Sequence, residues 1–205
     1  MFHVKHEAWT RSAALVGVTL SHGQVAALEA FEGLLAERAI PLGMVAHGDR
    51  DHLKDRHILD SIRAAPLLPG GDGEAADLGS GAGLPGIPLA IVRPDLQFRL
   101  IDVHRRRVAF MELAVDTIGL SNVAVEQRSV ETVVATFPVC LTRAFADPRR
   151  SWAFAERVLR PGGCLLYWAG KRFDVASGTP GGVAVSVRET PGLADAGPIV
   201  IMTRQ

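Results

Sequence analysis

A glycine-rich segment constrains the fold of this chain more than any other feature. It reads GSGAGLPG (residues 79–86), follows the apolar run Ala75–Leu78 and leads into a helical stretch that contains Pro88. Glycines allow the backbone to turn sharply and to approach a ligand without contact from a Cβ atom. Ligands of open α/β sheets collect at the carboxyl ends of the strands, next to such turns. The segment therefore predicts a parallel strand, a tight turn and a nucleotide-like ligand.

The apolar pattern beyond Glu74 predicts a parallel sheet with crossover helices. Seven runs are predicted as strands: Ala75–Leu78, Phe98–Asp102, Val123–Glu126, Val139–Thr142, Cys164–Trp168, Val183–Val187 and Ile199–Thr203. The clearest helix covers Arg105–Ile118, with Gly119 placed to end it. The last two runs are joined by a Pro/Gly-rich connection, which favours an antiparallel pair. The predicted fold class is α/β, a mostly parallel seven-stranded sheet with a terminal antiparallel strand, as in class I methyltransferases.

Residues 1–68 predict a helical cap on this sheet. Ser21 and Gln24 form a capping box ahead of one helix, and a second helix is predicted from Asp49 or Asp51 to Pro66. With 205 residues, the chain has the length of one domain. We expect a single domain over 1–205, with the cap at about 1–68 and a Rossmann-like core at about 74–205.

Composition excludes several classes of protein. Lys and Arg number 22, as do Asp and Glu, so a strongly basic tail-type nucleic-acid binder is disfavoured. No apolar run approaches the roughly 20 residues of a membrane span. Cys140 and Cys164 lie in separate apolar runs without the spacing of a metal site or disulfide framework. We expect a cytoplasmic protein without membrane association.

Histidines are concentrated in the first 57 residues, which raises the question of a metal site. His47, His52 and His57 recur at intervals of five, whereas ligands on one face of a helix recur at three or four. We therefore expect no metal, and interpret His57 as a residue that supports helix packing or the ligand site.

Three polar residues stand at or just beyond the predicted strand ends. Asp102 could accept hydrogen bonds from ribose hydroxyls, Glu131 could accept from an adenine amine, and Arg143 brings a cation to the same edge. The glycine pattern alone also matches dinucleotide enzymes. Tyr167 and Lys171 formally match the Tyr-x-x-x-Lys pair of some of them, but a strand does not bring positions i and i+4 together on one face as a helix does.

Three motifs together resemble the bacterial 16S rRNA guanine-N7 methyltransferase family, also called the glucose-inhibited division protein B family. They are RHILDS (residues 56–61), ADLGSGAGLPGIPL (76–89) and RAFA (143–146), in this order and spacing. The resemblance covers about residues 25–170. Two segments differ from the family pattern: Pro41-Leu42-Gly43 stands where the family has Asn-Leu-Thr, and Ala169-Gly170 where it has Lys-Gly.

The resemblance implies S-adenosylmethionine as the methyl donor and a guanine in the decoding-region loop of 16S rRNA as the acceptor. The substrate would be 16S rRNA or a small ribosomal subunit particle. The cofactor contacts implied are Gly79, Gly81, Gly83, Leu84, Asp102, Val130, Glu131 and Arg143. Arg143 would also serve as a catalytic residue by orienting either the cofactor or the guanine.

Guanine N7 carries an in-plane lone pair and no proton, so in-line attack on the sulfonium methyl needs no general base. Alignment and exclusion of water are what an enzyme must supply. An anionic RNA would bind basic side chains near the predicted site, and we select Arg149, Arg150, Lys171 and Arg172 as RNA contacts.

Other functions remain open on the sequence. The same scaffold could methylate another RNA or a small molecule, or bind S-adenosylmethionine without catalysis as a ribosome-assembly factor. Methylation of cytosine C5 needs a thiol nucleophile, but Cys140 lies within an apolar strand and is predicted to be a buried core residue.

Overall fold

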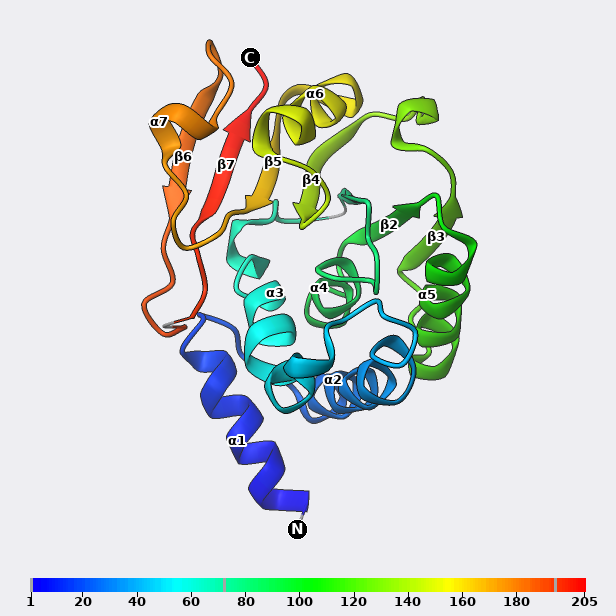
Figure 1. Ribbon diagram of the computed structural model, residues 1–205. Coiled ribbons are helices and arrows are strands. Elements are labelled where there is room, and N and C mark those ends of the chain that lie inside the picture. The colour runs from blue at the N-terminus through cyan, green and yellow to red at the C-terminus, as the bar shows by residue number, and fades with distance from the viewer. Residues whose placement is uncertain (1, 72, 194) are drawn as a thin grey trace.

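A seven-stranded sheet forms the centre of the computed structural model, which describes residues 2–71, 73–193 and 195–205 (Figure 1). The strand order is β3-β2-β1-β4-β5-β7-β6. The strands are β1 Glu74–Leu78, β2 Gln97–Asp102, β3 Val123–Gln127, β4 Phe137–Arg143, β5 Leu159–Trp168, β6 Ala184–Arg188 and β7 Ile199–Thr203. All seven predicted strands are present.

Only one strand runs against the others. β1 to β5 pair in parallel, whereas β7 is antiparallel both to β5 and to β6. The prediction of a mostly parallel sheet with a terminal antiparallel strand is confirmed. That strand is the last in the sequence, but it lies between β5 and β6, and β6 forms the edge of the sheet.

Helices pack on both faces of the sheet. The helices of the core are α4 Gly86–Val92, α5 Arg105–Ile118, α6 Pro148–Val158 and α7 Val175–Gly178, with a 3-10 turn at Val130–Thr132. The predicted helix Arg105–Ile118 is confirmed as α5. Gly119 ends it with φ +76°, and its N–H donates to the Val115 carbonyl.

Trp152 of α6 packs with Cys140 and Leu165 on one face of the sheet. α4 and α5 pack on the opposite face, together with the N-terminal segments.

The N-terminal segments form the predicted helical cap. They are α1 Phe2–Ala14, α2 His22–Leu34, a π-helical turn Leu35–Ala39, a 3-10 helix His47–His52, a π-helical turn Leu53–Leu59, α3 Asp60–Ile62 and a 3-10 turn Ala65–Leu67. The capping box of α2 is present, because Gln24 N–H donates to Ser21 Oγ and Ser21 N–H donates to Gln24 Oε1. α1 points away from the body of the molecule at its N-terminal end (Figure 1), but its residue Trp9 is buried.

The second cap helix, predicted from Asp49 or Asp51 to Pro66, is not one regular helix. The segment 47–62 changes from 3-10 to π and then to α geometry. In the π-helical turn, the carbonyl oxygens of Arg56 and His57 accept hydrogen bonds from the side chain of Arg143, which belongs to β4. Arg143 therefore ties this irregular segment of the cap to the sheet.

A search of the described part of the chain for membrane-spanning helices found none with sufficient length and apolar character.

Candidate active site

The glycine turn follows β1 at the point where the strand order reverses between β1 and β4, which is the usual place for a ligand in an open α/β sheet. The turn closes on itself, because the N–H groups of Gly83 and Leu84 both donate to the Ser80 carbonyl, at 2.9 and 3.0 Å. Gly81 N–H donates to Asp102 Oδ2 at 3.0 Å, so the turn is also tied to the end of β2. Gly81, Gly83 and Leu84 thus shape the turn.

Gly79 is the residue at which this turn requires glycine most strictly. Its φ is +75°, in the left-handed region, and a Cβ atom added to it would collide with the ring of Phe145. Phe145 follows β4, so the residues after β1 and β4 are in direct contact at the reversal point.

Asp102 is buried at the end of β2 and accepts four hydrogen bonds. Oδ1 accepts from His104 N at 2.9 Å and from His104 Nδ1 at 3.0 Å. Oδ2 accepts from Gly81 and from Arg107 Nη1, at 3.2 Å. Burial raises the pKa of this carboxyl, but the hydrogen bonds from His104 and Gly81 and the charge of Arg107 outweigh it, so that the pKa is lowered. Asp102 is therefore an anion that holds the neighbouring loop together.

A cleft of about 260 Å³, here called the small cleft, lies beside these residues. Four of the predicted cofactor contacts line it, namely Gly79, Asp102, Val130 and Glu131. The 3-10 turn after β3 carries Val130, which is buried, and Glu131, which is exposed. Arg150 of α6, a predicted RNA contact, lies on the rim together with Arg107 and Arg128.

Asp77, in β1, is a buried carboxyl beneath the glycine turn. Oδ2 accepts from Gly86 N–H at 2.9 Å, while Oδ1 has no hydrogen-bond partner among the described residues. Burial raises the pKa of Asp77 to about 7. A Cβ on Gly86 would collide with Leu100 and press on Asp77, so this glycine allows α4 to start directly against the sheet.

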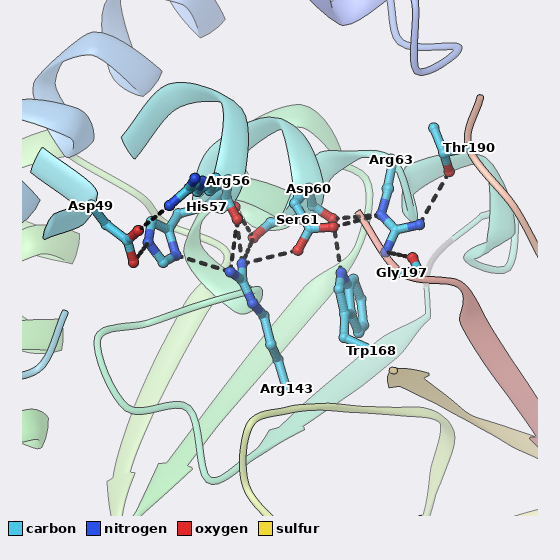
Figure 2. Close-up of polar contacts among 10 residues, drawn as sticks. All are labelled: Asp49, Arg56, His57, Asp60, Ser61, Arg63, Arg143, Trp168, Thr190 and Gly197. Carbon is cyan, nitrogen blue, oxygen red and sulfur yellow. Dashed lines mark hydrogen bonds and ion pairs between the residues drawn. The ribbon is translucent and has the colours of Figure 1, made fainter. Parts of the chain in front are cut away.

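Arg143 lies at the end of β4, and its side chain points to Arg56, His57 and Asp60 of the cap (Figure 2). It is not among the residues that line the small cleft. Nη2 donates to the Arg56 carbonyl at 2.8 Å and to His57 Nδ1 at 2.9 Å, and Nη1 donates to the His57 carbonyl at 3.2 Å. Nη1 also lies 3.3 Å from Asp60 Oδ2. The guanidinium therefore fastens the sheet to the π-helical turn Leu53–Leu59.

The contacts of His57 define which of its ring nitrogens carries the proton. Because a guanidinium can only donate, Nδ1 must accept from Arg143. Nε2 then carries the proton and donates to Asp49 Oδ2 at 3.0 Å. Burial lowers the pKa of His57, the charge of Arg143 lowers it further, and Asp49 opposes both. The neutral imidazole is thus the form that fits this network.

The same network continues from Asp60 along the ends of the neighbouring strands (Figure 2). Arg63 donates to Asp60 Oδ1 at 2.8 Å and to the Gly197 carbonyl at 2.8 Å. The indole N–H of Trp168, at the end of β5, donates to the Asp60 carbonyl at 2.8 Å. Asp60 therefore connects the cap to the ends of β4 and β5 and to the segment that precedes β7.

A second cavity of about 760 Å³, here called the large cavity, lies along this network. Arg143 and Ala144 line it on the β4 side, and Trp168, Lys171 and the Lys171 partner Asp195 line it on the β5 side. Both carboxylates and basic groups face it. It is therefore a place where a ligand with hydrogen-bond donors and acceptors could bind.

The predicted RNA contacts fall at two places along the carboxyl edge of the sheet. Arg149 and Arg150 lie in the first turn of α6, where Arg150 stacks on Phe154 at 5.6 Å. Lys171 and Arg172 follow β5 and are exposed, and Lys171 pairs with Asp195 at 2.6 Å. Arg150 lines the small cleft and Lys171 lines the large cavity, whereas Arg149 and Arg172 line neither of them.

Two alternative readings of the sequence lose their geometric basis. Tyr167 lies in β5 and donates to the Ala146 carbonyl at 3.2 Å, whereas Lys171 pairs with Asp195, so they do not form a catalytic pair. Cys140 is buried in β4, as predicted, and burial raises the pKa of its thiol well above the usual range.

Several residues of the site were not predicted from the sequence. Asp49, Asp60 and Arg63 join residues that lie far apart in the chain, and no local pattern announces such contacts. Phe145 is the exception, because its position directly after the strand-end Arg143 and Ala144 could have drawn attention to it.

A search for metal-binding groups of three or more His, Cys, Asp or Glu side chains found none within residues 2–71, 73–193 and 195–205.

The sheet order, the glycine turn and the acid at the end of β2 define a class I S-adenosylmethionine-dependent methyltransferase. Two solved structures share this fold. A SAM-dependent methyltransferase from Aquifex aeolicus aligns with a TM-score of 0.57 at 17% identity, covering 80% of this chain and 97% of that one. A putative S-adenosyl-L-methionine-dependent methyltransferase from Methanococcus maripaludis aligns with a TM-score of 0.57 at 14% identity, covering 77% and 91%.

The chain belongs to the GidB family, rRNA small subunit methyltransferase G, whose model matches residues 24–175. Ribosomal RNA small subunit methyltransferase G from Acidiphilium cryptum is 33% identical over 201 residues, which are 97% of this chain and 91% of that protein. The protein of the same name from Mycobacterium leprae (strain Br4923) is 36% identical over 194 residues, covering 85% and 78%. The chain is therefore a SAM-dependent methyltransferase that acts on small-subunit rRNA.

Proposed function

We propose that this chain transfers the methyl group of S-adenosylmethionine to N7 of a guanine in the decoding-region loop of 16S rRNA, by in-line displacement. The observation that carries the proposal is the meeting of the small cleft and the large cavity at residues 143–146. With S-adenosylmethionine on one side of this segment and the guanine on the other, the methyl donor and the methyl acceptor would face each other where the strand order reverses.

The residues around the small cleft fit the cofactor. The cofactor supplies an activated methyl on a sulfonium. Asp102 would hold the ribose hydroxyls. The exposed side chains of His104 and Arg107 would then have to release some of the carboxylate lone pairs to which they donate. Val130 would pack on the adenine, and Glu131 would accept from its amine. Gly79, Gly81, Gly83 and Leu84 would provide the turn on which the cofactor lies, with Gly79 in closest contact.

Arg143 acts in this proposal at the far end of the cofactor, beyond Gly79. Four of its contacts go to Arg56, His57 and Asp60, so its position is set by the cap. In addition to these contacts, Arg143 would present its positive charge to the cofactor carboxylate or to guanine O6. The fastening of Arg143 by the cap supports a role in alignment, which can contribute as much as about 7–11 kcal/mol in favourable cases.

Three titratable groups near the site are held in hydrogen bonds, which is in line with an acceptor that carries no proton. His57 is held between Asp49 and Arg143, Asp102 accepts four hydrogen bonds, and the Tyr167 hydroxyl donates to Ala146. Guanine N7 attacks through an in-plane lone pair and needs no base. The mixed lining of the large cavity also suits guanine, which offers N–H donors to carboxylates and O6 to basic groups.

The RNA would reach the site along the exposed basic residues Arg149, Arg150, Lys171 and Arg172. Contacts with phosphates make such binding strongly dependent on salt. We propose 16S rRNA or a small ribosomal subunit particle as the physiological substrate.

The experiment that tests this function is methyl transfer to ribosomal material from a strain that lacks the gene. The purified chain is incubated with labelled S-adenosylmethionine and either 16S rRNA or small subunits, and the modified nucleoside is identified by mass spectrometry. The proposal expects 7-methylguanosine in 16S rRNA. Another methylated nucleoside would exclude the N7 target, and binding of the cofactor without any transfer would favour an assembly factor.

A further inference from the structure

Consecutive residues at the end of β4 and directly beyond it line two different cavities. Arg143 and Ala144 line the large cavity, whereas Phe145 and Ala146 line the small cleft. Ala144 makes this change of direction with φ +50°, a left-handed conformation that non-glycine residues rarely adopt. Because Arg143 is held by the cap, the reversal at Ala144 directs Phe145 back over the glycine turn.

The ring of Phe145 covers Gly79 at this boundary. It lies so close that a Cβ on Gly79 would overlap the ring. Its centroid is 5.7 Å from that of Phe154, in a tilted arrangement, while 36% of Phe145 remains exposed. Phe145 is therefore supported from α6 but not enclosed.

The position of this ring limits the space for a ligand. The small cleft measures about 260 Å³, which is below the range of about 300–1,000 Å³ typical of small-molecule sites. The predicted cofactor contacts lie on both sides of the ring, with Val130 and Glu131 in the small cleft and Arg143 in the large cavity. A molecule that contacts both groups has to pass over Gly79, where Phe145 lies.

We infer that Phe145 occupies the path of the amino-acid portion of S-adenosylmethionine over Gly79, and that the ring must turn away for the complete cofactor to bind. The inference rests on the cofactor placement proposed above, but not on the identity of the methylated nucleotide. The apparent affinity for the cofactor is then reduced by the fraction of molecules in which the ring is turned away.

The test compares two ligands on the full chain by titration calorimetry. S-adenosylhomocysteine carries the amino-acid portion, whereas adenosine would occupy the small cleft alone. Phe145→Ala is expected to bind S-adenosylhomocysteine about two- to tenfold more tightly, since the contacts of the ring with Phe154 and Gly79 no longer oppose binding. Adenosine is expected to bind with unchanged affinity. In stopped-flow measurements, the gain for S-adenosylhomocysteine should appear in the association rate.

Two further variants control for general effects. Val103 lines the same cleft and is 52% exposed, and Val103→Ala should not tighten the binding of either ligand. Phe145→Leu keeps an apolar contact and is used if Phe145→Ala does not fold; it should tighten S-adenosylhomocysteine to a smaller extent.

The outcomes separate this inference from the cofactor placement. Equal or weaker binding of S-adenosylhomocysteine by the Phe145 variants overturns the inference, as does an equal gain for adenosine. Glu131→Ala tests the placement and should weaken both ligands. If Glu131→Ala weakens both while the Phe145 variants bring no gain, the placement stands and the role of Phe145 is refuted.

Discussion

At the scale of single residues, Gly79 carries two constraints that can be separated by mutation. Its backbone is left-handed, and its missing Cβ leaves room for whatever lies over the turn. Gly119 shares only the first constraint, because its φ is +76° and no described atom lies within 4 Å of the Cβ position. The pair therefore forms a matched comparison.

Gly79→Ala should weaken the binding of S-adenosylmethionine at least tenfold. It should also lower the free energy of unfolding by more than the about 1–2 kcal/mol that a left-handed L-residue costs, because the added Cβ meets the ring of Phe145. Gly119→Ala should lose only about 1–2 kcal/mol of stability, with unchanged affinity. Calorimetric titration and urea denaturation measure the two effects. Wild-type affinity in Gly79→Ala would show that the cofactor does not lie on this turn.

His57 makes the stability of the cap dependent on pH. Its pKa in the folded chain is lowered from the ordinary value of a histidine, about 6.5, because burial and Arg143 disfavour the charged ring. The unfolded chain therefore binds more protons below about pH 6.5, and the free energy of unfolding falls as the pH is lowered through this window. Asp77, with its pKa raised to about 7, contributes the opposite slope in part of the same range.

The contribution of His57 is isolated by comparison with His57→Gln. The difference in unfolding free energy between the unaltered chain and this variant should shrink as the pH falls from 7.5 to 5, measured by urea denaturation at each pH. His47→Gln serves as the control, since His47 is exposed on the neighbouring 3-10 helix. A difference that is constant with pH would contradict the assigned neutral form of His57.

At the scale of elements, Arg143 joins β4 to a segment that precedes it by about 86 residues in the chain. Arg143→Met removes the cation and leaves the carbonyls of Arg56 and His57 and one oxygen of Asp60 without this partner. We expect a loss of about 3–5 kcal/mol in unfolding free energy, as for broken buried ion pairs. Arg172→Met, at an exposed position, should change it by less than about 0.5 kcal/mol. A loss below 1 kcal/mol in Arg143→Met would refute the fastening role.

The elements differ in how far the sequence could predict them. The strands, α5 and the capping box of α2 follow from local patterns: apolar runs, a helical period ended by Gly119, and a Ser-x-x-Gln pair. The irregular segment 47–62 could not be predicted in this way, because apolar spacing that indicates a helix does not distinguish α from 3-10 or π geometry. The place of β7 inside the sheet is likewise a property of tertiary pairing.

The site shows the same division. Gly79, Asp102, Val130 and Glu131 were predicted from the turn, the strand ends and the family motifs, and they line one cleft. The orientation of Arg143 into the cap and the position of Phe145 over Gly79 depend on contacts between distant segments. Sequence patterns record which residues are present at the strand ends, but not which partner each of them faces.

At the scale of the whole molecule, the polar network around Asp60 joins the cap to the ends of β4 and β5 and to the segment before β7. We therefore propose that residues 1–205 unfold as one domain. Thermal unfolding should show a single transition with equal calorimetric and van't Hoff enthalpies. Separate transitions for the cap and the sheet would contradict a single domain.

The central claim is that the cofactor lies over the glycine turn at the junction of β1 and β4. A crystal structure of the chain with S-adenosylhomocysteine tests it most directly. We expect adenosine beside Asp102 and Glu131, with the amino-acid portion passing over Gly79 toward Arg143 and the ring of Phe145 turned away. Electron density for the ligand at another edge of the sheet, with no ligand beside Gly79, would contradict it.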